Sequence, residues 1–383
     1  MTSTTSATSA ASNHPALFAH LTIGTLTLPN RIMISPMCQY SAVEGNATAW
    51  HMVHLGSLAL SGAGLLCLEA TAVNPEGRIT YGCLGLYNDD NEAALQHVVQ
   101  SLRAVSAMPL AIQLSHAGRK ASSRSPWDGG SLIDLADGGW QPQAPSALPQ
   151  KPDEAAPHAL TTDEIGKLIE DFRAATVRAR RIGFDAIEVH MAHGYLLHQF
   201  LSPVANQRED DYGGSLENRM RLPLAVLAAV REVAGPDIAV GVRLSGTDWV
   251  EGGWDIEQSV QLCKQLEAAG CAFLDMSSGG ISPAQKIPLG PGYQVHLAQR
   301  IKREVAIPVI TVGLITDPQQ AETIIAEHQA DMVALARGML NDPRWPWRAA
   351  IALGGTVQAP KQFWRCLPHG TPPIFGDIKI GQR

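Results

Sequence analysis

Short runs of apolar residues recur along the chain, separated by intervals long enough to hold a helix. Continuous apolar runs of this length are typical of strands buried on both faces of a parallel sheet, and most of the intervals show helical periodicity. Eight runs predict strands: Arg31–Pro36, Gly64–Thr71, Pro109–Ser115, Phe184–His190, Ile238–Leu244, Ala272–Ser277, Pro308–Gly313 and Asp331–Ala336.

The helical pattern is clearest over Thr162–Gly183. Its polar start at Thr162 precedes Ile165, Leu168 and Phe172, which fall on one face of a helix. Eight strands alternating with helices predict a (β/α)8 TIM barrel, with a doubly wound open sheet as the alternative.

Two segments extend beyond a minimal barrel. Leu21–Leu28 alternates around Gly24 and predicts a β-hairpin that caps the bottom of the barrel. Ala117–Pro157, after the third strand, is rich in Gly, Pro, Ser and Trp and is too long for an ordinary connection, so we expect a lid. We expect residues 1–14 to be a disordered tail and residues 15–383 to form a single domain.

Composition excludes several classes of function. The 383 residues are 45% hydrophobic and 17% charged, as in a packed globular protein. Lys and Arg total 29 against 36 Asp and Glu, and the net charge of −7 without a basic run argues against nucleic acid. No apolar stretch predicts a membrane span, and six scattered cysteines without a C-x-x-C pair predict reduced thiols. We expect a cytoplasmic protein.

Catalytic residues of a barrel cluster at the carboxyl ends of its strands. The fourth strand ends at His190, which is followed by His193 and Tyr195, and Gly194 permits a turn that brings the three together. Two imidazoles could polarise a carbonyl or nitro oxygen while the phenol protonates the neighbouring carbon. A metal site is the alternative, but no carboxylate or cysteine lies at ligand spacing, and we expect Glu188 to point to the opposite strand face. We predict no metal.

Arg243 lies within an otherwise apolar strand, so it needs either a structural carboxylate partner or an anionic cofactor edge. Gly313 follows the seventh strand, and Ala336 and Arg337 follow the eighth. Many barrels bind phosphate at this place through backbone N–H groups. Together these positions predict a phosphorylated cofactor below an oxygen-binding, proton-donating group.

At these residues the sequence resembles the Old Yellow Enzyme family of FMN-dependent ene-reductases, and in particular its thermophilic-like branch. The likeness runs from about Leu17 to Leu367. Its most specific segments are Leu28–Arg31, Ser35–Tyr40, Glu69–Val73, Gln113–Lys120, His190–Leu196, Asn206–Arg208 and Tyr212–Arg219. We assign the last of these a structural role, with Ser215 capping the following helix.

The resemblance implies a barrel with tightly but non-covalently bound FMN. On this basis Ser35, Pro36, Met37 and Cys38 line the flavin, Ala70 and Gln113 hold its pyrimidine edge, Arg243 faces its N1/O2 side, and Gly313, Ala336 and Arg337 hold the phosphate. The family usually has glycine where this chain has Ala336, so a positive φ there would be strained.

The resemblance also implies the substrate site. His190 and His193 bind the substrate's electron-withdrawing oxygen, Tyr195 donates the proton, and Tyr40 and Cys38 contact the substrate. Arg365 belongs to a Gln-aromatic-x-Arg segment that reaches a neighbouring protomer's site in trans. This implies a homodimer or homotetramer, with residues 355–383 at the interface.

The implied reaction is ping-pong. NADPH or NADH passes hydride to the flavin N5 and leaves; an activated alkene (enone, enal, maleimide or nitroalkene) then takes hydride at its β-carbon and a proton from Tyr195 at its α-carbon. The alternatives are reduction of nitro-esters, nitroaromatics or quinones at the same site, and a non-enzymatic flavin-binding redox sensor.

Overall fold

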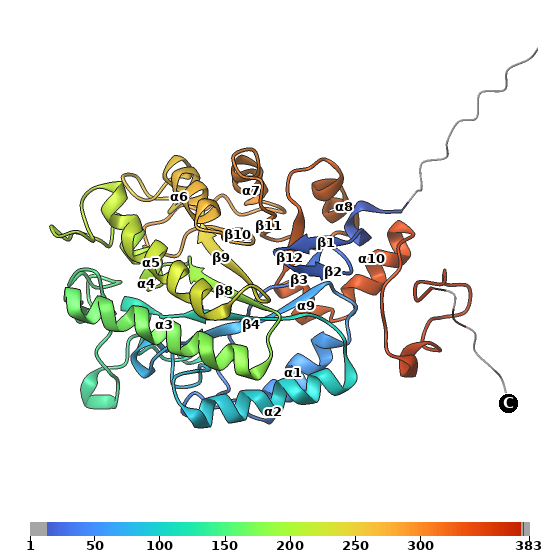
Figure 1. Ribbon diagram of the computed structural model, residues 1–383, viewed down its shortest axis with the longest axis horizontal. Helices are drawn as coiled ribbons and strands as arrows, with labels where there is room; N and C mark the ends of the chain where they lie inside the picture. The colour runs from blue at the N-terminus through green and yellow to red at the C-terminus, as the bar shows by residue number, and fades with distance from the viewer. Residues whose placement is uncertain (1–13, 377, 379–383) are drawn as a thin grey trace, which may run out of the picture.

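The apolar runs form a closed barrel in the computed structural model, which describes residues 14–376 and 378. Eight parallel strands close in the order β10-β11-β12-β3-β4-β5-β8-β9 (Figure 1), so the (β/α)8 barrel is confirmed and the open sheet is wrong. The barrel strands are β3 (Ile32–Ile34), β4 (Leu65–Ala72), β5 (Leu110–Ser115), β8 (Ala186–Met191), β9 (Ala239–Ser245), β10 (Leu274–Ser277), β11 (Val309–Val312) and β12 (Met332–Leu335).

Helices follow the strands and cover the outside of the barrel. The longest, α3, confirms the predicted helix: Thr161 caps it, Glu164 completes a capping box, and Gly183 ends it at φ 94°. Ser215 caps α5 as expected, by accepting from the Asn218 N–H. The helices are α1 (Ala49–Ala59), α2 (Asp89–Val105), α3 (Thr162–Ile182), α4 (Leu196–Leu201), α5 (Leu216–Ala234), α6 (Ile256–Ala268), α7 (Val295–Lys302), α8 (Pro318–Ala326), α9 (Arg337–Asn341) and α10 (Trp345–Leu353).

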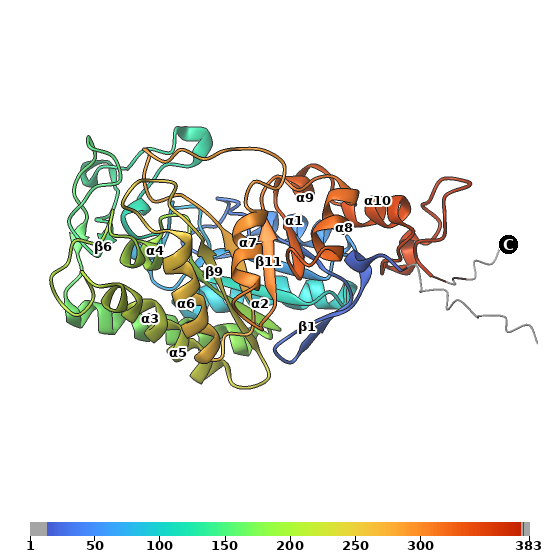
Figure 2. The same ribbon diagram turned by 90° about the horizontal axis from the view of Figure 1, so that it is seen from above.

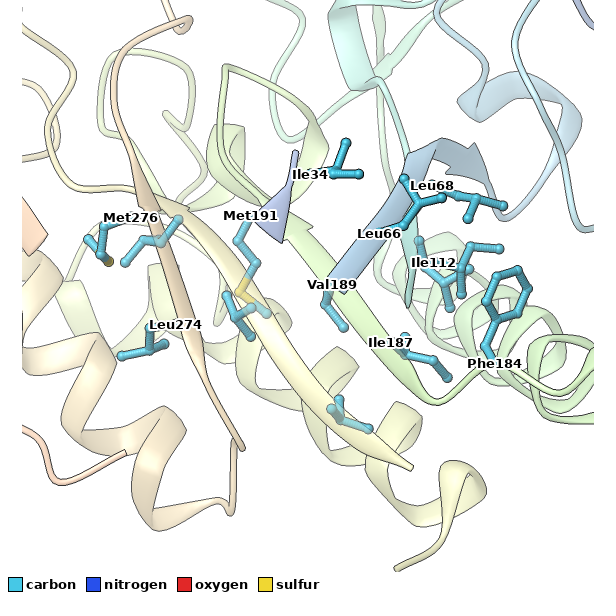
Figure 3. Close-up of a cluster of buried hydrophobic side chains, with 14 of the residues drawn as sticks. Ile34, Leu66, Leu68, Ile112, Phe184, Ile187, Val189, Met191, Leu274 and Met276 are labelled. Atoms are coloured by element: carbon cyan, nitrogen blue, oxygen red, sulfur yellow. The ribbon is translucent and has the colours of Figure 1, made fainter. Parts of the chain in front are cut away.

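The two faces of each strand belong to different cores. Ile187, Val189 and Met191 of β8 point outward into the layer between barrel and helices, which Figure 3 shows. Strand side chains alternate, so Glu188 and His190 both point into the barrel. The expectation that Glu188 faces away from His190 is therefore wrong, because residues two apart in a strand share a face.

A β-hairpin fills the bottom of the barrel. Strands β1 (Leu21–Ile23) and β2 (Leu26–Leu28) pair antiparallel, and Ile23 and Leu28 are fully buried. They pack into an inner cluster that contains four buried alanines, Ala111, Ala186, Ala239 and Ala334. The hairpin thus supplies the volume that the alanines leave empty, as the sequence predicted.

The insertion after β5 and the C-terminal segment lie at opposite ends of the molecule. The insertion carries short 3-10 turns and a small sheet of β6 (Gln143–Ala144) and β7 (His158–Ala159). Both views place it at the end of the long axis away from residues 355–376 (Figures 1 and 2). The expected tail falls almost entirely on residues 1–13, which lie outside the described residues. Within the described part, none of the helices is long and apolar enough to cross a bilayer.

Candidate active site

The chain turns sharply after β8, and this turn builds the centre of the site. His193 and Gly194 adopt positive φ angles of 59° and 72°. A Cβ on Gly194 would lie 2.0 Å from the Gly280 carbonyl oxygen, so glycine is required by both its φ and this close approach. The turn places Tyr195 as the residue before α4 and beside His190, with ring centroids 5.0 Å apart.

The two imidazoles converge. His190 Nε2 lies 3.3 Å from His193 Nδ1, and His190 Nδ1 accepts from the Ala192 N–H at 3.2 Å. His190 therefore carries its proton on Nε2. Burial and then the charge of Arg243 hold the pKa of both histidines well below the ordinary value, so both imidazoles are neutral.

Ser277 completes this pair, and the sequence reasoning missed it. Its Oγ lies 2.7 Å from His193 Nε2. With the His190 proton on Nε2, His193 Nδ1 accepts from it, so His193 donates from Nε2 to Ser277 Oγ, which can donate in turn to Gln294 Oε1 at 3.5 Å. A substrate oxygen between the two rings would favour the other tautomer, in which Ser277 donates to Nε2 and both imidazoles point an N–H at that oxygen. Ser277 is the last residue of a predicted strand, so the rule that chemistry gathers at strand ends could have found it.

Tyr195 is a neutral phenol beside a partly buried ammonium. Burial raises the pKa of Tyr195 well above the ordinary value, and the nearby Cys38 and Tyr40 raise it further. Lys120 Nζ lies 5.2 Å from the centroid of the Tyr195 ring and donates to the carbonyl oxygens of His193 (2.9 Å) and Gly280 (3.2 Å). Burial, and then the charge of Arg119, lowers the pKa of Lys120 to about 8.

Lys120 lies in the Gln113–Lys120 segment that resembles the Old Yellow Enzyme family. The sequence predicted no role for it, because its contacts come from loops distant in sequence.

The insertion covers the site. Trp127 packs edge-on against Tyr40, with centroids 5.5 Å apart. A cleft of about 290 Å³ lies between the insertion and the two phenols of Tyr40 and Tyr195. Burial and then the nearby Cys38 thiol raise the pKa of Tyr40, so these two predicted substrate contacts are neighbours. The pKa of the Cys38 thiol is raised by burial and by the nearby Cys83 and Glu69.

The residues predicted to hold a flavin's ring lie around the upper interior of the barrel. A β-bulge between Leu68 and Ala70 sets Ala70 opposite Gln113. Ser35 is 1% exposed, and its hydroxyl has no partner among the described residues. Pro36 and Met37 are half-buried beside it.

Arg243 has the carboxylate partner that sequence reasoning left open. Its Nε lies 3.1 Å from Asp275 Oδ2, and both side chains are buried. The neighbouring position on β8 is His190, so the arginine lies level with the two imidazoles. Asp275 was not predicted as a site residue.

The ends of β11 and β12 lie side by side in the barrel. Gly313 is buried at φ 129°, and a Cβ there would lie 2.9 Å from Gln294 Nε2. Ala336 has φ −102°, so the expected strain of alanine at a glycine position does not arise. Arg337 is exposed and begins α9.

Arg365 does not join this group. It is exposed and lies in the C-terminal segment, at the end of the molecule away from the insertion. Among the described residues, no cluster of three or more His, Cys, Asp or Glu side chains has a geometry that could hold a metal ion.

Comparisons with known proteins identify relatives along nearly the whole chain. A family model described as "NADH:flavin oxidoreductase / NADH oxidase family" matches residues 16–354. An NADPH dehydrogenase of Listeria welshimeri is 42% identical over 352 residues, which cover 91% of this chain and 98% of the relative.

Comparison with solved structures also identifies relatives along most of the chain. Morphinone reductase in complex with tetrahydroNAD is 31% identical with a TM-score of 0.73, covering 91% of this chain and 93% of that one. An old yellow enzyme homologue from Zymomonas mobilis is 26% identical with a TM-score of 0.72, covering 87% and 92%.

Proposed function

Because the chain belongs to the NADH:flavin oxidoreductase / NADH oxidase family, which confirms the resemblance to Old Yellow Enzyme, we propose that it is an FMN-dependent reductase of activated alkenes. It is an oxidoreductase with FMN as cofactor and NAD(P)H as reductant. The observation that carries the proposed substrate class is the pair of converging neutral imidazoles beside a neutral phenol.

The residues present fit a flavin. Ser35 presents a buried hydroxyl without a partner among the described residues, as expected of a group that bonds to a bound molecule. A side chain at Gly313 would collide with Gln294. Because glycine has no side chain, the backbone N–H of Gly313 would be accessible to a phosphate. Ser35, Pro36, Met37, Ala70, Gln113 and Arg243 would hold the ring, and Gly313, Ala336 and Arg337 the phosphate.

FMN, when bound, takes hydride from the nicotinamide and passes it to the substrate. The protein's part is to bind and polarise. His190 Nε2 and His193 Nδ1 lie 3.3 Å apart, and with Ser277 donating to His193 Nε2 both nitrogens would donate to the carbonyl or nitro oxygen of an alkene placed between them. Negative charge develops on this oxygen as hydride arrives at the β-carbon, so fixed donors lower the barrier.

Tyr195 supplies the proton. Its raised pKa keeps the phenol protonated at neutral pH, and its ring packs against His190, next to the position of the substrate oxygen. Tyr40 and Cys38 would contact the substrate from the opposite loop. The cleft of about 290 Å³ has room for a small enone, enal, maleimide or nitroalkene.

Anaerobic stopped-flow absorbance in the flavin's visible band tests the proposal. NADPH should bleach the purified yellow protein, and 2-cyclohexenone should restore the colour. Tyr195→Phe should still bleach but recolour at least about 10²-fold more slowly, since a positioned proton donor contributes roughly 10²–10⁴-fold. Recolouring by nitroaromatics or quinones but not by the enone would replace alkene reduction with the alternative, and an unchanged Tyr195→Phe variant would exclude Tyr195 as donor.

We further infer that residues 15–383 act as one domain and that Arg365 reaches a neighbouring copy in a homodimer or homotetramer. Exposure of Arg365 away from its own site supports the second inference. All six cysteines are free, which supports a reducing compartment such as the cytoplasm. Arg365→Ala should lower the affinity for the enone in a sample whose mass by light scattering remains oligomeric; a monomeric native protein would refute the contact.

A further inference from the structure

Three ionisable side chains, Glu188, Arg243 and Asp275, lie inside the barrel at the level of His190 and just below it, and the proposed reaction assigns no role to the two carboxyl groups. Glu188 and Asp275 are fully buried, and Arg243 is 6% exposed. Two buried carboxyl groups face one buried arginine. Because an unpaired buried charge costs several kcal/mol, it would be costly for both carboxyl groups to be ionised at the same time.

The contacts of the two carboxyl groups differ. Asp275 Oδ2 lies 3.1 Å from Arg243 Nε, which stabilises an ionised aspartate. Glu188 Oε1 instead accepts from the neutral amide of Gln113 at 2.7 Å. In the described part of the chain, Glu188 Oε2 and both Asp275 oxygens have no hydrogen-bond donor.

We propose that Glu188 and Asp275 form a carboxyl pair that holds one proton, so that Asp275 neutralises Arg243 and Glu188 stays protonated until the charge around it changes. This inference rests on the proposed function only where it concerns the cofactor. The pair, rather than Arg243 alone, then sets the charge that the barrel presents to the flavin.

The surroundings of the pair support this assignment. Inward-facing neighbours of Glu188 are Gln113 on β5, Arg243 on β9 and Asp275 on β10, with His190 on its own strand and Cys67 on β4. Across the barrel, β3, β11 and β12 contribute the apolar Met33, Ile310 and Met332. Burial, and then the charge of Asp275, raises the pKa of Glu188 to about 8, against the lowering effect of Arg243 and Gln113.

The pair couples to reduction through charge. A hydride adds one negative charge to the cofactor that Arg243 is proposed to hold, and this charge disfavours ionisation of Glu188. Above about pH 8, where the resting pair has lost its proton, reduction should draw one proton from water into the pair. The midpoint potential should therefore fall with pH more steeply above pH 8 than below it.

Infrared spectroscopy of the full-length protein tests the resting proton without any turnover. A protonated buried carboxyl gives a C=O stretch above the amide band, which shifts in D2O. We expect this band at neutral pH, with a decline through about pH 8. Glu188→Gln should remove this titrating component, leaving at most a contribution from Glu69, another buried carboxyl group whose pKa is raised by burial. Asp275→Asn should also lose the titrating component, because Glu188 would then ionise to pair with Arg243.

Controls separate this role from general disturbance of the barrel. Asp331→Asn removes a carboxylate that binds Lys302 and the Val309 N–H, away from the pair, and should keep the band. Gln113→Leu removes a hydrogen bond to Glu188 and should move the loss of the band to higher pH. These variants keep the test decisive if Glu188→Gln does not fold.

The second measurement is the potential of the flavin-loaded protein against pH. Wild type and Asp331→Asn should share the steeper limb above pH 8, and Glu188→Gln should lack it. A band that is undiminished in Glu188→Gln, or a wild type without it at neutral pH, would overturn the carboxyl pair. Failure to bind flavin would refute the proposed function but leave the infrared result to decide the proton.

Discussion

Replacement of Ser277 by alanine should slow the enzyme by removing control of a histidine tautomer. The Ser277 hydroxyl lies 2.7 Å from His193 Nε2 and 3.5 Å from Gln294 Oε1. When it donates to His193 Nε2, the His193 proton is placed on Nδ1, where it can face a substrate oxygen. A hydrogen bond to a group that becomes charged contributes about 1.5–3 kcal/mol. Since His193 can still adopt the required tautomer for part of the time, we expect the lower end of this range, or about a tenfold loss in the rate of recolouring by the enone.

The assay is single-turnover reoxidation by 2-cyclohexenone over a range of pH. In Ser277→Ala, protonation of His193 restores an N–H on Nδ1, so the rate should rise toward acid, below the ordinary histidine pKa. Ser277→Thr should restore the rate. Ser278→Ala is the matched control, because Ser278 bonds Gln294 and makes no hydrogen bond to His193. Equal losses in Ser277→Ala and Ser278→Ala, or a flat pH profile, would refute the tautomer argument.

Three further changes have defined outcomes. Gly194→Ala should lower the urea midpoint or prevent folding, whereas Gly252→Ala, with nearly the same φ of 71° but nothing within 4 Å, should cost only about 1 kcal/mol. Lys120→Met should slow reoxidation by loosening the His193 and Gly280 loops while Lys120→Arg partly rescues it; unchanged kinetics would exclude the role. Burial lowers the folded-state pKa of His116 to about 4. The neutral imidazole therefore contributes fully to the free energy of unfolding above pH 6.5, and on the order of 3 kcal/mol of this contribution is lost as the pH falls to 4. Denaturation of His116→Asn should not show this loss.

Strand and helix positions could be predicted because they depend on local periodicity. The runs of β8 and β9 are buried on both faces, and α3 shows its cap and its buried face in the sequence itself. The hairpin could also be predicted from the sequence, because alternation around Gly24 leaves Ile23 and Leu28 on one side. The error at Glu188 was avoidable, since strand alternation alone places it with His190.

The contacts that tune the site could not be predicted in the same way. Asp275 meets Arg243 through the lateral register of β9 and β10, and that register is a property of the closed barrel. Lys120 reaches Tyr195 only because the β8 and β10 loops meet at Gly194 and Gly280. Composition predicted the insertion, but the packing of Trp127 on Tyr40 requires the insertion's folded path.

Several buried polar atoms without a hydrogen-bond partner lie together at this site, although others, such as those of Thr311 and Trp347, lie elsewhere in the described core. The lower interior of the barrel is apolar, with the hairpin packed against its alanines at the bottom. Above it, Ser35, Glu188, Arg243 and Asp275 all carry buried atoms without a hydrogen-bond partner among the described residues. Each such atom costs about 1–3 kcal/mol, so a chain selected for stability alone would replace these side chains. Their convergence at the carboxyl ends of the strands is explained by a bound polar group that supplies the missing partners, and by a carboxyl pair that keeps the local charge near zero before that group is reduced.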